Sequence, residues 1–233
     1  MSVRAHDGSQ INSLGEAWRE FRRKRGPWVI AGAILVVLAA RVALGPPGWP
    51  DAAAGLFILV VYPFGEWAIH VHLLHLRPLH FRGRQVELPT ARAHRAHHED
   101  PRSLDLINFS PLEALAILIL AVPAAAALAD GVLALAGKPL SAGPLVTMLL
   151  TGYLMVGAYE WTHFLIHTAH RPRSRYYRSI WRNHRLHHYK NEHYWHGITS
   201  TVGDRLLGTN PDHAGIPRSP TARTLLGDDP GLA

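Results

Sequence analysis

The sequence predicts an all-α membrane protein, with four transmembrane helices and a cytoplasmic cap of histidine-rich helices. Hydrophobic residues make up 48% of the 233 residues, and they are concentrated in four long segments. Most of the 24 Lys and Arg residues and of the 17 His residues lie between these segments or at their ends. Apolar stretches that alternate with basic, polar ones are typical of helices that cross a membrane and are joined by loops at its surface.

A helix needs about 20 mostly apolar residues to cross the hydrocarbon core of a bilayer. Four segments come close to this length, at about 27–44, 52–70, 111–128 and 144–165. Residues 1–26 are polar and form the predicted cytoplasmic N-terminal segment. Residues 27–208 form the predicted membrane domain, and residues 209–233, rich in Pro, Gly and Asp, are predicted to be an irregular tail.

The distribution of charge predicts the orientation. Only Arg41 and Lys138 of the 24 basic residues fall on the side assigned as outside. Basic residues favour the cytoplasmic side, so we expect an integral membrane protein whose histidines face the cytoplasm. The excess of Arg over Lys and the many Ala residues indicate a bacterial inner membrane. The net charge of +7 lies beside apolar segments, which favours lipid head groups over nucleic acid as its partner.

Two pentapeptides, at 94–98 and 184–188, share the pattern His-Arg-X-His-His. Positions i, i+3 and i+4 lie on one face of a helix, so each pentapeptide would present three imidazoles together. Each follows an apolar segment that ends in Glu-Trp and then carries two more histidines. The candidate metal ligands are therefore His70, His75, His94, His97, His98, His163, His167, His184, His187 and His188.

The spacing within these pairs differs. His163 and His167 are four residues apart and share a helix face. His70 and His75 are five apart, so they converge only if the helix unwinds near Leu74 or if two metals are approached from different sides. The two halves read as parallel repeats, each supplying about half of a two-metal site, although chance in a histidine-rich chain is the alternative.

The other candidate residues are less strongly indicated. Glu66 and Glu160, at the ends of two apolar segments, are the candidate catalytic carboxylates, and with Glu99 and Asp100 they could orient ligand N–H groups. Seven histidines lie outside the pattern. We expect His6, His80 and His213 to be solvated or structural, and leave open the roles of His72, His170, His193 and His196.

Composition excludes several chemistries. The chain has no cysteine, which removes disulfide scaffolds, thiolate zinc sites, iron–sulfur clusters and cysteine nucleophiles. The His-Glu-X-X-His pattern of zinc hydrolases is also absent. Imidazole ligands alone suit iron, zinc, copper or nickel, so the residues themselves predict metal chemistry at a membrane without choosing the metal.

The order of these histidines resembles the fatty acid hydroxylase/sterol desaturase superfamily of membrane di-metal oxygenases. Residues 66–70, 159–163 and 187–205 resemble its fatty acid 2-hydroxylase branch, and the resemblance covers about residues 52–208. It implies that all ten histidines hold two iron ions, which zinc can replace in purified protein. It also implies a monooxygenase that uses O2 to hydroxylate a C–H bond of a lipid or fatty acyl substrate within the membrane.

The resemblance leaves alternatives on the same scaffold, namely a desaturase or a carotenoid or sterol oxidase. A histidine-rich membrane protein that binds metal without turnover is a further alternative. Some relatives fuse a cytochrome b5 domain, but the His-Pro-Gly-Gly haem motif is absent here. We therefore expect the electrons to come from an electron-transfer protein in trans.

Overall fold

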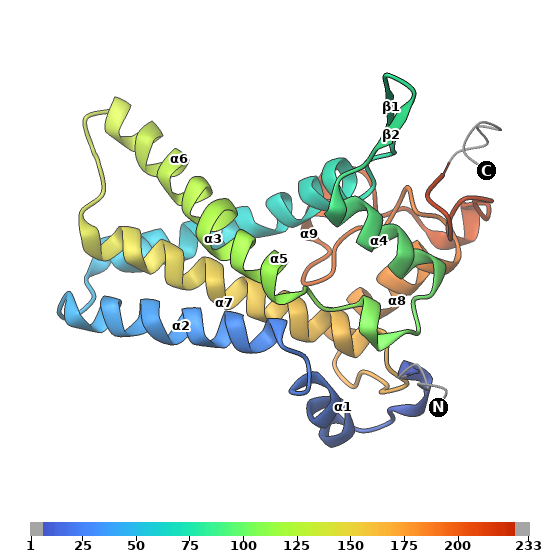
Figure 1. Ribbon diagram of the computed structural model, residues 1–233. Helices are drawn as coiled ribbons and strands as arrows, with labels where there is room; N and C mark the ends of the chain where they lie inside the picture. Colours follow the sequence, from blue (N-terminus) through green and yellow to red (C-terminus); the bar gives the residue numbers. More distant parts are fainter. Residues whose placement is uncertain (1–6, 227–233) are drawn as a thin grey trace. The chain divides into compact units, whose positions relative to one another are not determined.

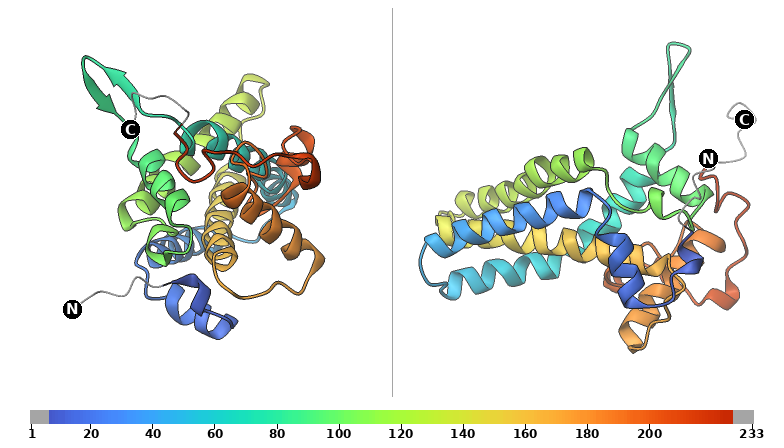
Figure 2. Two further views of the ribbon diagram at one scale, coloured as in Figure 1. Left: turned by 90° about the vertical axis from the view of Figure 1, so that its right-hand side faces the viewer. Right: turned by 60° about the horizontal axis from the view of Figure 1, so that its bottom comes forward.

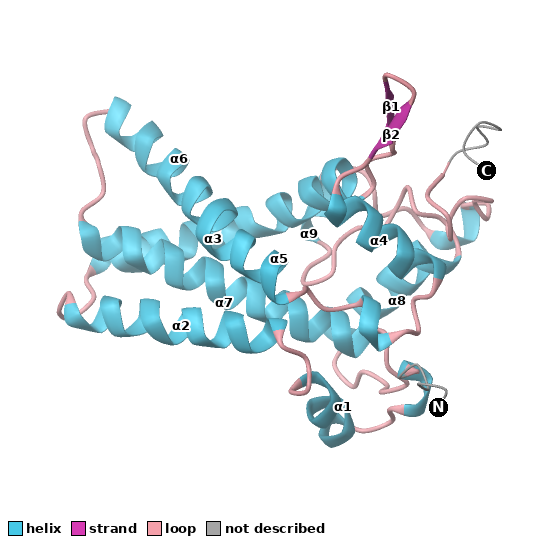
Figure 3. Cartoon of the chain, in the orientation of Figure 1, coloured by secondary structure: helices cyan, strands magenta, loops and turns pink. Residues whose placement is uncertain are grey.

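The computed structural model describes residues 7–226, and these residues are mostly helical (Figures 1 and 3). Two π-helices, η2 (His70–Leu74) and η4 (Ile117–Ala121), continue from α3 and α5, and three short 3-10 helices are η1 (Gly8–Gln10), η3 (Leu104–Leu106) and η5 (His213–Gly215). The α-helices are α1 (Leu14–Phe21), α2 (Gly26–Ala43), α3 (Trp49–Ile69), α4 (Pro89–Glu99), α5 (Pro111–Ala116), α6 (Val122–Leu135), α7 (Ala142–Ile166), α8 (Arg175–Tyr189) and α9 (Val202–Leu206).

Four helical runs among the described residues are long and apolar enough to cross a membrane. They are Gly26–Ala43, Trp49–Leu74, Leu104–Leu135 and Ala142–Ile166. The third is longer than the predicted span 111–128, because α5, η4 and α6 follow one another without a break. The predicted all-α membrane fold with four spans is therefore confirmed. The cytoplasmic orientation of the histidines stays a prediction.

Contacts divide the chain into two compact units, and α3 and α7 each contribute to both. One unit, here called the bundle unit, comprises residues 19–62 and 108–161. The other, here called the histidine unit, comprises the described residues up to 18, residues 63–107 and those from 162 onwards. The predicted membrane domain 27–208 thus contributes to both units, and the described part of the predicted tail, residues 209–226, belongs to the histidine unit.

The bundle unit is held together by two small apolar clusters that share α7. Ile30 of α2, Leu118 of η4 and Tyr153 of α7 form one cluster, and Ala54 of α3, Ala126 of α6 and Met148 of α7 form the other. Figure 2 shows these helices lying side by side. Outward-facing side chains are also apolar, with Leu35 66% and Val60 58% exposed. Helices that are apolar on all sides fit a lipid surrounding.

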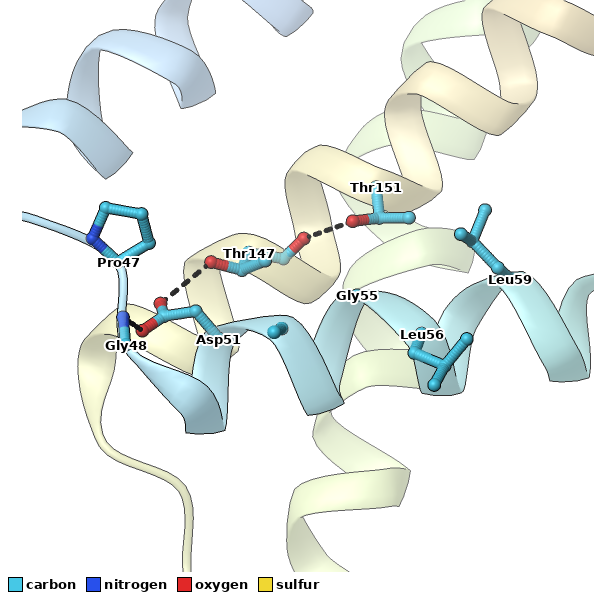
Figure 4. Close-up of a pocket in the computed structure, with 9 residues that line it drawn as sticks. Pro47, Gly48, Asp51, Gly55, Leu56, Leu59, Thr147 and Thr151 are labelled. Carbon is cyan, nitrogen blue, oxygen red and sulfur yellow. Dashed lines mark hydrogen bonds between the residues drawn. The ribbon is translucent and has the colours of Figure 1, made fainter.

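A charged pair closes the hairpin between α2 and α3. The Arg41 guanidinium lies 2.7 Å from Asp51 Oδ1 and donates to Thr147 Oγ1 of α7 at 2.8 Å. Thr147 in turn donates to Asp51, and the Gly48 N–H donates to the other carboxylate oxygen (Figure 4). A charge in a membrane helix needs such partners. Arg41 is one of the two basic residues assigned to the outer side. Its contacts show that it also holds α2, α3 and α7 of the bundle unit together.

The histidine unit contains two short strands that the sequence did not indicate. Strands β1 (Leu79–Phe81) and β2 (Arg84–Val86) form an antiparallel hairpin, where a helical cap was expected. Its two turn residues, Arg82 and Gly83, both have positive φ angles, 51° and 72°. Two positive φ values suit the right-handed twist of a tight hairpin. The sequence signal was weak because Arg, unlike Asn or Gly, seldom adopts this conformation.

Two glycines of α2 provide a test of the packing in the bundle unit. A Cβ atom on Gly26 would lie 2.0 Å from the Phe109 carbonyl oxygen, whereas one on Gly32 meets nothing within 4 Å. We expect Gly26→Ala to lower the free energy of unfolding by about 1–3 kcal/mol. Gly32→Ala, in the same helix, should leave it unchanged or raise it by up to about 1 kcal/mol. Denaturant titrations in detergent micelles measure both, and equal stabilities would contradict this packing.

Candidate metal centre

All ten predicted ligands lie in the histidine unit, and the structure gathers them into two groups of five. Within each group, one potential ligand atom per residue lies within 4.8 Å of all the others. Cluster 1 consists of His70, His75, His94, His98 and His187, and cluster 2 of His97, His163, His167, His184 and His188. The clusters adjoin, since the ring centroids of His98 and His188 are 4.1 Å apart.

The two His-Arg-X-His-His pentapeptides each serve both clusters. In α4, His94 and His98 join cluster 1, while His97 joins cluster 2. In α8 the pattern is reversed, because His184 and His188 join cluster 2 while His187 joins cluster 1. The first and last histidines of each pentapeptide thus join the histidine pair that precedes them in the sequence. The middle histidine, at i+3, joins the cluster of the other repeat. This exchange supports the predicted internal repeat.

A π-helix brings His70 and His75 together. Residues 70–74 form η2, in which the His75 N–H donates to the His70 carbonyl oxygen, five residues back, at 3.2 Å. Hydrogen bonds from i+5 to i define a π-helix, and such single turns are frequent at functional sites. The ring centroids of the two histidines are consequently only 4.9 Å apart. The sequence left two ways for His70 and His75 to act together, a local change of the helix or two metals approached from different sides. The structure shows a local change of the helix.

The nitrogen atoms of cluster 2 converge as ligands of an ion would. His184 Nε2 lies 3.1 Å from His163 Nε2, 3.1 Å from His167 Nε2 and 3.0 Å from His188 Nε2. An imidazole Nε2 carries either one hydrogen or one lone pair, so His184 Nε2 cannot make hydrogen bonds to all three of these nitrogens. Nitrogens bound about 2.1 Å from one metal lie roughly 3.0–3.4 Å apart, which matches these distances.

Backbone carbonyls fix the orientation of three rings in cluster 1. His70 Nδ1 donates to the His196 carbonyl oxygen at 2.6 Å, His187 Nδ1 to Tyr194 at 2.8 Å and His98 Nδ1 to Ala222 at 2.8 Å. Metal-bound histidines usually donate their second ring N–H in this way, which directs the other nitrogen at the metal.

The second nitrogens of two of these rings, His98 and His187, are left without a partner in the described part of the chain, while His70 Nε2 lies 3.1 Å from His94 Nε2. His98 Nε2 and His187 Nε2 are buried and have no hydrogen-bond partner among the described residues, and the same is true of His75 Nε2. A buried nitrogen without a partner is costly, and a bound cation satisfies it. The residues present therefore fit a metal in cluster 1 as well as in cluster 2.

Burial keeps the imidazoles neutral. It lowers the pKa of His98 to about 4 and holds the pKa values of His94, His184 and His187 well below the ordinary value for histidine. Only the neutral ring offers a lone pair to a metal. The clusters therefore contain nitrogens that are ready to bind an ion at neutral pH.

Glu66 and Glu160 are buried, but neither belongs to the two groups of potential ligands that the described residues form. Glu66 accepts hydrogen bonds from the N–H groups of Ile198, at 2.5 Å, and Thr199, at 3.0 Å, and from the Thr199 hydroxyl. Glu160, in the bundle unit, accepts from Asn108 at 3.0 Å. Both carboxylates hold a loop in place, and the catalytic role predicted for them stays a prediction. Glu99 and Asp100 are exposed and outside both clusters.

His196 is the histidine outside the pattern that lies nearest to cluster 1. Its buried ring is centred 5.1 Å from the ring of His187, and Asp204 holds its backbone N–H at 2.9 Å. Asp204 lies in the stretch 187–205 that carries the resemblance, but its hydrogen bond to this loop was not predicted, because it depends on the path of the chain. Of the other histidines, His170 is partly exposed, His72, His80, His193 and His213 are exposed, and His6 lies outside the described residues.

The part of the chain that contains the two histidine clusters is similar to known proteins. Residues 55–209, which include all ten histidines, match the family model described as fatty acid hydroxylase. The dihydroceramide fatty acyl 2-hydroxylase FAH2 of Arabidopsis thaliana is 27% identical over 156 residues, which cover 66% of this chain and 61% of that protein. The chain therefore spans less than two thirds of this relative's length. No solved structure matches the chain.

The two clusters predict the metal content of the protein. We expect the folded protein, counted for iron and zinc together by mass spectrometry, to hold about two ions per chain. His94→Ala and His184→Ala should each lower this to roughly one ion, because each removes a ligand from a different cluster. His193→Ala, which changes an exposed histidine of the same unit, is the matched control and should keep both ions. One ion per chain in the unaltered protein would contradict two separate clusters.

Proposed function

Because the chain belongs to the fatty acid hydroxylase family, we propose that it is a monooxygenase that hydroxylates a C–H bond of a fatty acyl chain in a membrane lipid. The family membership confirms the resemblance found in the histidine pattern. The observation that carries the proposal is the pair of adjoining, buried clusters of five imidazoles. Such clusters are suited to a dinuclear metal centre.

We propose iron as the metal, and two iron ions would supply the activation of O2. The overall reaction places one oxygen atom in the C–H bond, and the other leaves as water after taking up two electrons and two protons. The protein holds the ligands neutral and keeps water away from them, since eight of the ten histidines are less than 7% exposed. A dry, shaped cavity limits side reactions of a strongly oxidising centre.

The substrate and partners are part of the same proposal. The Arabidopsis relative is named a fatty acyl 2-hydroxylase, so we propose carbon 2 of an acyl chain as the position oxidised. Four apolar helical runs support delivery of the substrate from within the membrane. We further propose that the electrons come from a separate electron-transfer protein, and that the clusters face the cytoplasm of a bacterial inner membrane.

Glu66 supports this centre through the loop that it holds. Its carboxylate binds the N–H groups of residues 198 and 199, and residue 196 of the same loop accepts the hydrogen bond from His70. We propose that Glu66 positions His70 in this way. For Glu160, the catalytic role read from the sequence remains our proposal.

Mass spectrometry of lipids from cells grown under 18O2 with a reductase present tests the proposed reaction. The unaltered protein should produce 18O-labelled 2-hydroxy acyl chains. His187→Ala should lower the label by about 100-fold or more, because even partners outside the ligand shell contribute about 10–100-fold. His193→Ala should behave like the unaltered protein. Glu66→Gln should lose metal and product in parallel if Glu66 positions His70, and product alone if it acts on the substrate.

Two outcomes would count against the proposal. Unlabelled lipids from the unaltered protein, with two ions bound, would indicate a metal-binding protein without this activity. A new double bond without 18O would indicate a desaturase.

A further inference from the structure

The end of the described chain, residues 213–226, here called the C-terminal strap, lies beyond the residues that match the family model. It has almost no regular secondary structure, as predicted for the tail. Even so, Ala222 is 3% and Leu225 6% exposed. A segment that is irregular and yet buried must be held by specific contacts.

The first group of contacts joins the strap to the end of α8. The Ser219 N–H donates to the Lys190 carbonyl oxygen at 2.8 Å, and Asn191 Nδ2 donates to the Pro217 carbonyl oxygen at 3.3 Å. The hydroxyls of Ser219 and Thr221 both donate to Glu192 Oε1. The residues contacted by the strap, 190–192, follow shortly after the pentapeptide at 184–188.

The second group of contacts joins the strap to the end of α4. Arg223 donates to the carbonyl oxygens of His98, at 2.7 Å, and of Glu99. In the same place His98 Nδ1 donates to the Ala222 carbonyl oxygen at 2.8 Å. The strap therefore connects the C-terminal ends of both helices that carry the His-Arg-X-His-His pattern, and it supplies the acceptor for one ligand ring.

We infer that the C-terminal strap is a positioning element of the metal centre, in which Arg223 holds the Ala222 carbonyl against His98. The inference rests on the proposed function only in that cluster 1 binds a metal ion. Without the strap, the His98 ring loses the hydrogen bond that fixes its orientation and keeps the proton on Nδ1. Metal affinity should then fall at cluster 1 and not at cluster 2.

Metal retention in the full chain tests this role. Arg223→Ala should release one of two ions to a chelator about 10–100-fold faster than the unaltered protein, as expected for loss of a partner of a ligand. Arg223→Lys, which keeps a donor, should restore part of the retention. Arg218→Ala removes the same charge from an exposed position of the strap and is the matched control.

The outcomes separate the two ideas. If the unaltered protein holds two ions and Arg223→Ala keeps both at the unaltered rate, the strap has no positioning role. If the unaltered protein holds no ions, the proposed metal centre itself fails. Loss of both ions at equal rates would show general unfolding and would also overturn the inference, so circular dichroism is recorded on each variant.

A second, independent observation concerns the hairpin of β1 and β2, which stands out from η2 and α4 in Figures 1 and 2. Leu79 pairs with Val86 and Phe81 with Arg84, and cross-strand partners share a face. Leu79, Phe81 and Val86 are 60%, 62% and 53% exposed. One face of the hairpin therefore carries three uncovered apolar side chains, with Arg84 at its turn end.

The charges and the connection of the hairpin indicate what covers this face. Arg77, Arg82 and Arg84 are exposed, while Glu87 is bound to Arg95, so the hairpin is cationic. It begins five residues after Leu74, the last residue of a membrane-spanning run. Five residues reach at most about 17 Å, so the base of the hairpin cannot leave the neighbourhood of the membrane surface.

We propose that this hairpin lies in the head-group region of an anionic membrane, with its apolar face inserted and its arginines on lipid phosphates. The chain has no cysteine, so single spin labels can be placed. In nanodiscs with phosphatidylglycerol, a label at Phe81→Cys should be shielded from a water-soluble nickel reagent and open to O2. A label at Asp212→Cys, whose side chain is 85% exposed, is the aqueous control.

Lipid charge gives the second comparison. In nanodiscs of phosphatidylcholine alone, the label at position 81 should become more open to nickel, because the arginines lose their anionic partners. If the labels at 81 and 212 are equally open to nickel in the anionic nanodiscs, the hairpin does not bind lipid and a protein partner is the better explanation of the apolar face.

Discussion

The histidine unit depends on keeping ten imidazole rings together in a place that water scarcely reaches. Rings such as those of His98 and His187 each present a buried Nε2 without a hydrogen-bond partner, and each such group costs about 1–3 kcal/mol. Apolar packing cannot satisfy these nitrogens, whereas a cation can. Metal binding and folding of this unit are therefore linked, because an ion removes a cost that the metal-free fold carries.

The partners that orient the rings belong to the backbone. The carbonyls of Tyr194, His196 and Ala222 accept from three ligand rings, and any residue type offers a carbonyl. What matters is the path of the chain, which Asp204 fixes by accepting from the N–H groups of residues 196 and 197. The loops after α8 thus shape the centre as much as the helices that bear the ligands.

Helical periodicity was sufficient to predict that histidines such as His184 and His188 gather, because these positions share a face of any α-helix. Composition and length were sufficient to predict the four spans. Neither pattern could predict that His97 and His187 cross between clusters, because this depends on how α4 and α8 pack. The π-helix at residues 70–74 could be inferred only as a need for His70 and His75 to meet. The hydrogen bond from His98 to the Ala222 carbonyl could not be predicted, since every residue type has the same backbone carbonyl.

The crossing of His97 and His187 has a consequence for how the centre fills with metal. An ion at either cluster takes one ligand from the helix that mainly serves the other, so it immobilises both α4 and α8. The second ion then meets ligands whose conformational entropy has already been lost, which favours cooperative loading. Such coupling is reciprocal, so an ion in either cluster raises the affinity of the other cluster for its own ion by the same factor.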